Sequence, residues 1–114
     1  MGAMATGSGE VYAALFENGL VKIGITRDIE RRISQLDTLP IELLEIVTVF
    51  VETNLLRTEM DLHFIYKDVR VRGEYFKFCW KDWIKFFEYW NNFSSAKSSG
   101  LIDALAKYYP ECNL

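Results

Sequence analysis

The sequence predicts an α/β (α+β) fold: a small central antiparallel β-sheet flanked by helices, followed by a C-terminal helical extension. Asn18-Gly19, a strong hairpin turn between two stretches of β-forming residues, indicates the sheet. The run 41–51, which is almost continuously apolar, indicates a central strand covered on both faces. Aromatic residues at helical spacing over 80–92 indicate the helical layer. A length of 114 residues, half of them hydrophobic, suffices for one domain with its own core.

Composition limits the class of protein. A net charge of -3 argues against a strongly basic protein that coats nucleic acid, although local charge matters more than net charge. No run approaches the roughly 18 apolar residues of a membrane span, and no signal peptide is visible. We therefore expect an intracellular protein, cytoplasmic or nuclear, without a membrane partner. Cys79 and Cys112 lack metal-ligand spacing and are interpreted as buried or idle thiols.

The chain divides into three segments. Residues 1–9 are typical of an expression remnant and a flexible lead-in, and residues 10–93 form the folded domain. Residues 94–114 are expected to contain a linker over 94–100 and a last short helix over 101–109.

The first half of the domain begins with a hairpin and continues with a helix. Strands are predicted over 10–17 and 20–26. Asp28 is placed to cap a helix over 29–36. The apolar residues of this helix share one face: Ile29, Ile33 and Leu36. Arg32 lies at the edge of that face, about 60° from Ile29, whereas Arg31 points into solvent.

The second half alternates strands and helices. After the central strand 41–51, Thr53 or Asn54 caps a helix over 55–66, and 73–78 forms a late strand. The helix over 80–92 carries an apolar stripe made of Trp83, Phe86, Phe87 and Trp90. Left in water, this stripe would expose a large apolar patch. We expect it to cover one face of the sheet or to form a homodimer with a second copy.

Glu59 breaks the pattern of the helix over 55–66. It projects within about 60° of an apolar stripe made of Leu55, Leu56, Leu62 and Tyr66. A carboxylate there is costly unless it is paired. A structural salt bridge, for example to Arg32, and a role as metal ligand or catalytic acid are both open. His63, one turn later, can share this site, although a lone His is more often a satisfied structural residue.

Three residues of the hairpin also have two interpretations. A Tyr in a strand, such as Tyr12, is ordinarily a core residue. Lys22 in a hairpin strand ordinarily faces solvent. Gly24, two residues later on the same face, indicates close approach of another group.

Together these residues form an ordered set at characteristic spacings: Tyr12, Lys22, Gly24, Arg32 and Glu59. The runs Glu59-Met-Asp-Leu-His63 and Gly73-Glu74-Tyr75-Phe76 follow. Over residues 10–78 this resembles the GIY-YIG nuclease superfamily, in particular its KIG-type branch of T5orf172- or Mug113-like domains. The chain departs from the pattern at Glu10-Val11, where Gly-Ile is usual, and at Leu36, where many members have His.

The resemblance implies a divalent-metal-dependent endonuclease that hydrolyses phosphodiester bonds in DNA, or alternatively in RNA. It implies that Glu59 binds Mg²⁺ or Mn²⁺ and that Tyr12, as general base, acts with Lys22, Arg32 and His63 in catalysis. The basic clusters are then nucleic-acid-binding candidates: Arg27, Arg31, Lys67, Arg70 and Arg72.

Two alternatives remain beside an active enzyme. One is a catalytically inactive member that binds nucleic acid or a protein partner through the same groove. The other is an oligomerisation module built on the aromatic helix. The chain shows no helix-turn-helix or zinc finger that would supply sequence-specific targeting.

A shared site requires a particular hairpin loop. Opposed residues share a sheet face, so Tyr12 and Lys22 lie on one face only if paired residue numbers have an even sum. We therefore predict a three-residue loop with Gly19 in the left-handed region, in which Phe16 pairs with Leu20.

Overall fold

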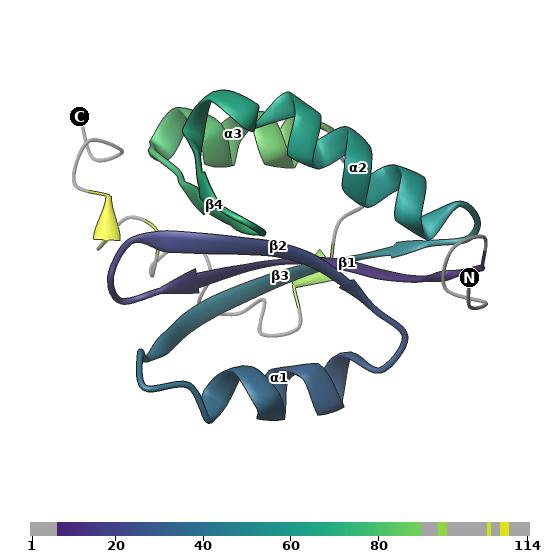
Figure 1. Cartoon of the computed structure of the whole chain (residues 1–114), viewed down its shortest axis with the longest axis horizontal. Coiled ribbons are helices and arrows are strands. Elements are labelled where there is room, and N and C mark those ends of the chain that lie inside the picture. Colours follow the sequence, from purple (N-terminus) through teal and green to yellow (C-terminus); the bar gives the residue numbers. More distant parts are fainter. Residues whose placement is uncertain (1–6, 90–93, 96–104, 106–107, 110–114) are drawn as a thin grey trace.

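The computed structural model describes residues 7–89, 94–95, 105 and 108–109, and within them an antiparallel sheet carries helices on both faces (Figure 1). The strands stand in the order β4-β5-β2-β1-β3-β6. The elements are β1 (Gly9–Phe16), β2 (Leu20–Thr26), α1 (Ile29–Asp37), β3 (Leu43–Val51), α2 (Leu55–Ile65), the 3-10 turn η2 (Lys67–Val69), β4 (Arg70–Arg72), β5 (Tyr75–Lys77), α3 (Trp80–Tyr89) and β6 (Ser94–Ser95). The predicted α+β architecture is confirmed.

The β1–β2 hairpin has the predicted register. Ala14 pairs with Lys22, and Tyr12 pairs with Gly24. The backbone N–H of Gly19 donates to the Phe16 carbonyl at 2.9 Å, and Gly19 has φ of 86°. The loop therefore contains three residues, and the side chains of Tyr12 and Lys22 lie on the same face of the sheet.

The two faces of the sheet have separate cores. The larger core lies beneath α2 and α3 and receives the odd-numbered residues of β1: Val11, Ala13 and Leu15. The opposite face is covered by α1 and receives the even-numbered residues: Tyr12, Ala14 and Phe16. Figure 1 shows α1 on one side of the sheet and α2 with α3 on the other. β3 is covered on both faces, as its apolar run predicts.

α1 forms as predicted because its N-terminus is capped and its apolar stripe is covered. Asp28 Oδ1 accepts a hydrogen bond from the backbone N–H of Arg31 at 3.0 Å. Leu36 is buried, and Ile29 and Ile33 pack against the smaller core. Arg31 is exposed and Arg32 is half-buried at the edge of the stripe.

α2 begins at the predicted residue but without the predicted cap. Asn54 occupies the N-cap position with φ of 56°, and its side chain makes no capping hydrogen bond. The reason is local geometry, because Asn tolerates the left-handed conformation that this turn requires. The sequence also failed to indicate β4. Its three residues are all exposed and form a strand only by pairing with β5 across Gly73, which has φ of 56°.

The apolar stripe of α3 is used within the chain. Trp83 and Phe86 are fully buried in the larger core, and Phe87 packs against it. The prediction that the stripe covers one face of the sheet is therefore confirmed for these residues. Trp90 lies outside the described residues. A homodimer through this helix stays a prediction.

The C-terminal segment differs from the predicted linker. Ser94 and Ser95, placed in a linker by the sequence, pair with β3 as β6. Leu105 and Tyr109 are buried in the larger core, and the Trp83 indole N–H donates to the Tyr109 hydroxyl at 3.0 Å. The rest of the predicted helix over 101–109, residues 1–6 of the lead-in and Cys112 lie outside the described residues.

Cys79 is an exposed free thiol and not a buried one. In the part of the chain described, no helix is both long and apolar enough to cross a membrane.

Candidate active site at the open edge of β2

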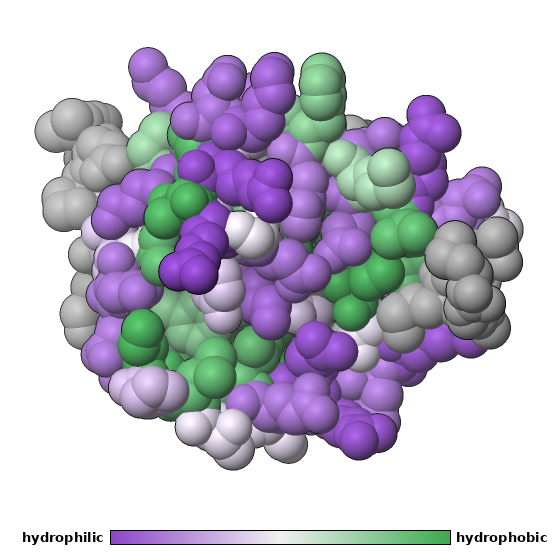
Figure 2. Space-filling model, in the orientation of Figure 1, coloured by the Kyte–Doolittle hydropathy of each residue, from purple (hydrophilic) through white to green (hydrophobic). Residues whose placement is uncertain are grey.

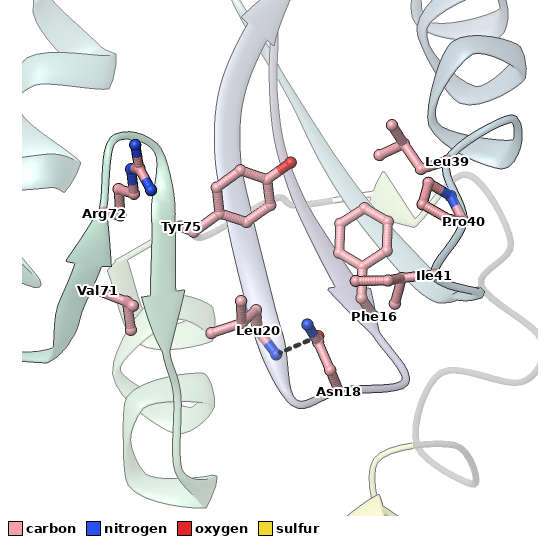
Figure 3. Close-up of a pocket in the computed structure, with 9 residues that line it drawn as sticks. All are labelled: Phe16, Asn18, Leu20, Leu39, Pro40, Ile41, Val71, Arg72 and Tyr75. Atoms are coloured by element: carbon pink, nitrogen blue, oxygen red, sulfur yellow. Dashed lines mark hydrogen bonds between the residues drawn. The ribbon is translucent and has the colours of Figure 1, made fainter.

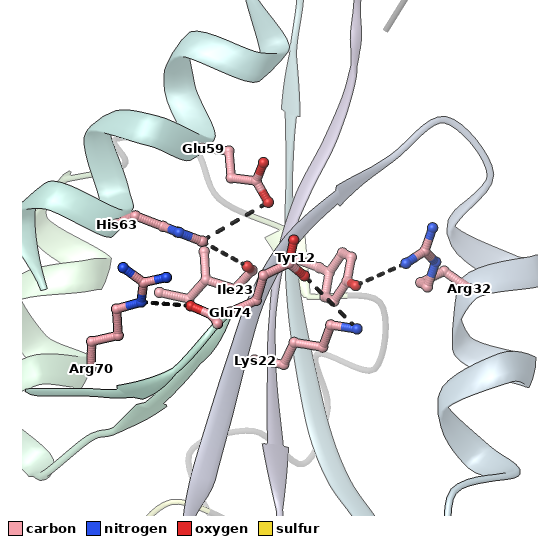
Figure 4. Close-up of polar contacts among 9 residues, drawn as sticks. Tyr12, Lys22, Ile23, Arg32, Glu59, His63, Arg70 and Glu74 are labelled. Carbon is pink, nitrogen blue, oxygen red and sulfur yellow. Dashed lines mark hydrogen bonds and ion pairs between the residues drawn. The ribbon is translucent and has the colours of Figure 1, made fainter. Parts of the chain in front are cut away.

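The candidate site forms where one edge of β2 loses its neighbour. β5 pairs with β2 only from Leu20 to Lys22, and the Ile23 N–H donates one more hydrogen bond to the Glu74 carbonyl at 2.9 Å. Beyond this point no described strand pairs with this side of Gly24 to Thr26, which form an open edge. Side chains from the two faces of the sheet can therefore meet around it, as Figure 4 shows for Glu59 on one side and Tyr12 on the other.

Gly24 determines where the Tyr12 side chain lies. A Cβ atom at Gly24 would stand 2.6 Å from the Tyr12 hydroxyl oxygen and 2.8 Å from its Cζ. The Tyr12 ring therefore lies directly across the β2 backbone, in space that only glycine leaves open. The predicted close approach at Gly24 is confirmed, and the approaching group is Tyr12.

Tyr12 is fully buried and contacts Arg32 of α1. An Arg32 guanidinium N–H donates to the Tyr12 hydroxyl at 3.4 Å, and the guanidinium carbon lies 5.9 Å from the ring centroid. Burial raises the pKa of Tyr12 to about 12, although the positive charge of Arg32 acts in the opposite direction. The phenol therefore keeps its proton at neutral pH in the absence of further positive charge.

Lys22 is turned into the site and not into solvent. Its side chain is only 18% exposed, and its Nζ lies 3.8 Å from Glu74 Oε1. The same ammonium group stands 5.7 Å from the centroid of the Tyr75 ring. The ordinary interpretation of a hairpin Lys as solvent-facing is therefore wrong here.

Glu59 brings a buried carboxylate to the edge from α2. Its side chain is 12% exposed. Among the described residues its Oε2 has no hydrogen-bond partner. Burial, followed by the neighbouring Glu74 carboxylate, raises the pKa of Glu59 to about 7, and Lys22 opposes this shift.

The structural salt bridge to Arg32 is not formed. Within the described part of the chain no ion pair joins Glu59 to Arg32, and Figure 4 shows Arg32 on the far side of Tyr12. Glu59 instead faces a second carboxylate, an arrangement that a cation or a shared proton can stabilise.

His63 lies beside Glu59 and is held by the backbone. Its Nε2 is 3.0 Å from the Ile23 carbonyl oxygen and 3.9 Å from Glu59 Oε2. Because a carbonyl can only accept, Nε2 carries the hydrogen and is committed to the strand edge. This contact matches the structural role that the sequence left open for a lone His.

Glu74 is the site residue that sequence reasoning missed. It lies in the turn between β4 and β5, within reach of both Lys22 and Glu59. The signal was present, because Glu74 belongs to the Gly73-Glu74-Tyr75-Phe76 run on which the resemblance partly rests. Only the pairing of β5 with β2 shows that this carboxylate reaches the site.

The basic residues fall into separate groups. Arg27, Arg31 and Arg32 line a hollow of about 340 Å³ beside α1, together with Thr26, Asp28 and Gln35. Arg70 and Arg72 lie on the β4–β5 hairpin. Lys67 begins η2, where its Nζ stands 4.5 Å from the Phe64 ring centroid. The structure thus joins the first group to the site through Arg32 and leaves Lys67 apart.

The donor set at the edge is small. Among the described residues there is no group of three or more His, Cys, Asp or Glu side chains that could hold a metal ion. Within the described part of the chain, the neighbouring carboxylates of Glu59 and Glu74 are two oxygen donors that a cation could share, and it would keep other ligands such as water.

Comparison with known proteins identifies a family for this chain. A family model described as T5orf172 domain matches residues 9–91, a range that includes every element from β1 to α3. This domain falls in the GIY-YIG or endonuclease-like group and indicates a nuclease-like or DNA-binding role. No curated protein and no solved structure matches the chain.

Proposed function

The chain belongs to the T5orf172 domain family, and from that premise we propose that it is a divalent-metal-dependent endonuclease of the GIY-YIG superfamily's KIG-type branch, acting on phosphodiester bonds in DNA. One observation carries the proposal. Around the open edge of β2, a buried carboxylate oxygen of Glu59 has no hydrogen-bond partner among the described residues and lies beside Glu74 and Lys22. Tyr12 and Arg32 adjoin this group.

The carboxylates fit the divalent cation that the family implies. Glu59 Oε2 is a buried oxygen without a partner among the described residues, and Glu74 adds a second hard oxygen donor beside it. These two residues would hold Mg²⁺ or Mn²⁺. When bound, such an ion polarises a phosphate and stabilises a leaving oxygen.

In this proposal, positively charged side chains bind the substrate phosphate. Arg32 offers a planar fork of donors, and it stands where the hollow formed with Arg27 and Arg31 meets Tyr12. Lys22 supplies a second positive charge on the same sheet face. A DNA strand lying along α1 would place a phosphate between these groups in spite of the chain's net charge of -3.

Tyr12 orients the reacting groups and, when its pKa falls, accepts a proton. At neutral pH its hydroxyl is protonated and can donate a hydrogen bond to the attacking water or to the phosphate. Proton removal from the phenol requires more positive charge nearby. The cation would add that charge to those of Arg32 and Lys22.

The binding-module alternative is supported by one observation. Tyr12 is fully buried, and burial holds its pKa well above neutrality. A member that had lost catalysis could keep this residue as part of the smaller core. Its basic hollow would then bind nucleic acid without cutting it.

Cleavage assays separate the two. Purified protein is incubated with plasmid, single-stranded DNA and RNA, each with Mg²⁺, Mn²⁺ or EDTA. We expect DNA cleavage that EDTA stops and that Glu59→Gln abolishes. Asp61→Asn is the matched control, because Asp61 lies on the same helix in an exposed pair with Arg57. A wild-type protein that binds nucleic acid, but binds no divalent ion and cuts no substrate, would establish the binding module instead.

A further inference from the structure

A second recess lies on the α1 side of the sheet, at the loop end of the β1–β2 hairpin. It is a cavity of about 300 Å³. Figure 3 shows three segments around it, and Figure 2 shows apolar residues gathered over this end of the molecule, at lower left. The hairpin contributes Phe16, Asn18 and Leu20; the α1–β3 loop contributes Leu39, Pro40 and Ile41; the β4–β5 hairpin contributes Val71, Arg72 and Tyr75.

The lining suits a flat aromatic ligand with polar edges. The rings of Phe16 and Tyr75 stand 6.3 Å apart between centroids and form one wall. Asn18 Oδ1 accepts a hydrogen bond from the Leu20 N–H at 3.1 Å, so the amide nitrogen of Asn18 is the group that can donate to a ligand. Arg72, exposed at the rim, can stack on a ring or bind its acceptors.

Tyr75 joins this pocket to the candidate active site. Tyr75 pairs with Lys22 across β5 and β2, and the Lys22 ammonium lies over the Tyr75 ring. Phe16 stands on the same face of β1 as Tyr12, four residues further along the strand. That spacing is about 14 Å, within reach of the nucleotides that flank a bound phosphate.

We propose that this pocket receives one unpaired base of the DNA strand whose phosphate lies at Tyr12 and Arg32. The inference rests on the proposed function and adds a substrate class: DNA with unpaired nucleotides beside the cut, in preference to uninterrupted duplex. An apolar slot flanked by Lys22 and Arg72 matches a base on a phosphodiester strand better than an uncharged peptide or lipid. A paired base would first have to leave its stack.

Abasic scanning tests the proposal. Single-stranded oligonucleotides carry one stable abasic residue at successive positions, and binding is measured by fluorescence anisotropy in EDTA so that no strand is cut. Loss of one stacked base is expected to weaken binding by about tenfold at a single position. Abasic residues elsewhere are expected to change the affinity by less than about twofold.

A filled pocket should remove that position dependence. Leu39→Trp places an indole at the rim, and Leu44→Trp is the matched control, because Leu39 and Leu44 are 40% and 37% exposed and only Leu39 lines the cavity. We expect Leu39→Trp to flatten the abasic profile and Leu44→Trp to keep it. If thermal melting shows that Leu39→Trp is unfolded, Arg72→Ala replaces it, with Arg57→Ala on the exposed surface of α2 as the control.

Parallel cleavage assays keep the two proposals distinguishable. If the affinity of the wild-type protein does not depend on the position of the abasic residue, and metal-dependent cleavage is intact, the base pocket is overturned and the endonuclease proposal is kept. A position-dependent profile without cleavage supports the pocket and overturns the endonuclease. Absence of both DNA binding and cleavage overturns both. A profile that persists unchanged in a folded Leu39→Trp protein also overturns the pocket.

Discussion

The Tyr12 side chain fills the space beside Gly24 across the β1–β2 pair: its hydroxyl oxygen lies 2.6 Å from the position that a Cβ atom at Gly24 would take. This relationship turns the phenol across β2, near the point where the pairing with β5 ends and where Glu74 and Lys22 lie. It also makes the placement of Tyr12 testable by substitution at either residue.

Gly24→Ala is expected to destabilise the fold by about 1–3 kcal/mol because the new methyl group overpacks the Tyr12 ring. Tyr12→Phe should not relieve this cost, since the Cζ atom at 2.8 Å remains. Tyr12→Leu should relieve most of it. Urea unfolding of the single and double variants measures the coupling between the two sites. If Gly24→Ala costs as much in the Tyr12→Leu protein as in the wild type, the packing described is contradicted.

Glu59 should make stability depend on pH. Its pKa is raised to about 7 from 4.5, so between these values the folded protein holds more protons than the unfolded chain. Stability is therefore greatest below about pH 4.5 for this group and is lost as the pH rises through 7. Glu59→Gln should remove that slope and stabilise the protein at pH 8 by about 1–2 kcal/mol, after allowance for partial solvent contact.

Thermal melting from pH 5 to pH 8 checks this, with Asp61→Asn as the control. Mg²⁺ should raise the wild-type melting temperature at pH 8 and leave that of Glu59→Gln unchanged. A lower melting temperature for Glu59→Gln at pH 8 would show that the carboxylate is a structural partner.

Arg32→Ala should lower cleavage strongly, by about 2–4 kcal/mol of transition-state stabilisation, because the phosphate loses a donor. Arg31, its exposed neighbour on α1, is the matched control, and Arg31→Ala should weaken DNA binding without a comparable loss of rate. Single-turnover kinetics at saturating protein separates the two effects. Tyr12→Phe should likewise affect the rate more than binding.

Glu74→Gln should weaken Mg²⁺ binding by about tenfold or more, since an oxygen ligand or its close neighbour loses its charge. Glu30→Gln, on the exposed surface of α1, is expected to leave that affinity unchanged. Isothermal titration calorimetry with Mg²⁺ in the absence of DNA provides the measurement. Unchanged binding in Glu74→Gln would remove this residue from the metal site.

Local chemistry allowed most of the fold to be predicted. The Asn18-Gly19 turn and the parity of Tyr12 and Lys22 determined the hairpin register, and Asp28 determined the start of α1. The predicted capping hydrogen bond of α2 was wrong, because the turn before this helix requires Asn54 in the left-handed conformation. The residue type alone does not indicate that conformation. β4 was missed because three exposed residues carry no periodic signal and depend on β5 for pairing.

The sequence indicated residues of the candidate site, but not the contacts between them. The resemblance to the GIY-YIG superfamily indicated Tyr12, Lys22, Arg32 and Glu59 as candidates, yet Glu59 meets Glu74 and not Arg32. That contact depends on where β5 stops pairing with β2, which no local pattern encodes. The base pocket likewise draws on three segments distant in the sequence.

The hydrogen bond between Trp83 and Tyr109 has a practical consequence for anyone defining this domain. The family match ends at residue 91, but the tyrosine that covers the Trp83 indole lies well beyond that boundary. A fragment cut at the family boundary would expose to water a tryptophan that is fully buried in the whole chain. A shift of the tryptophan emission to longer wavelength would report that loss, so fluorescence can show whether a shortened protein keeps Trp83 buried.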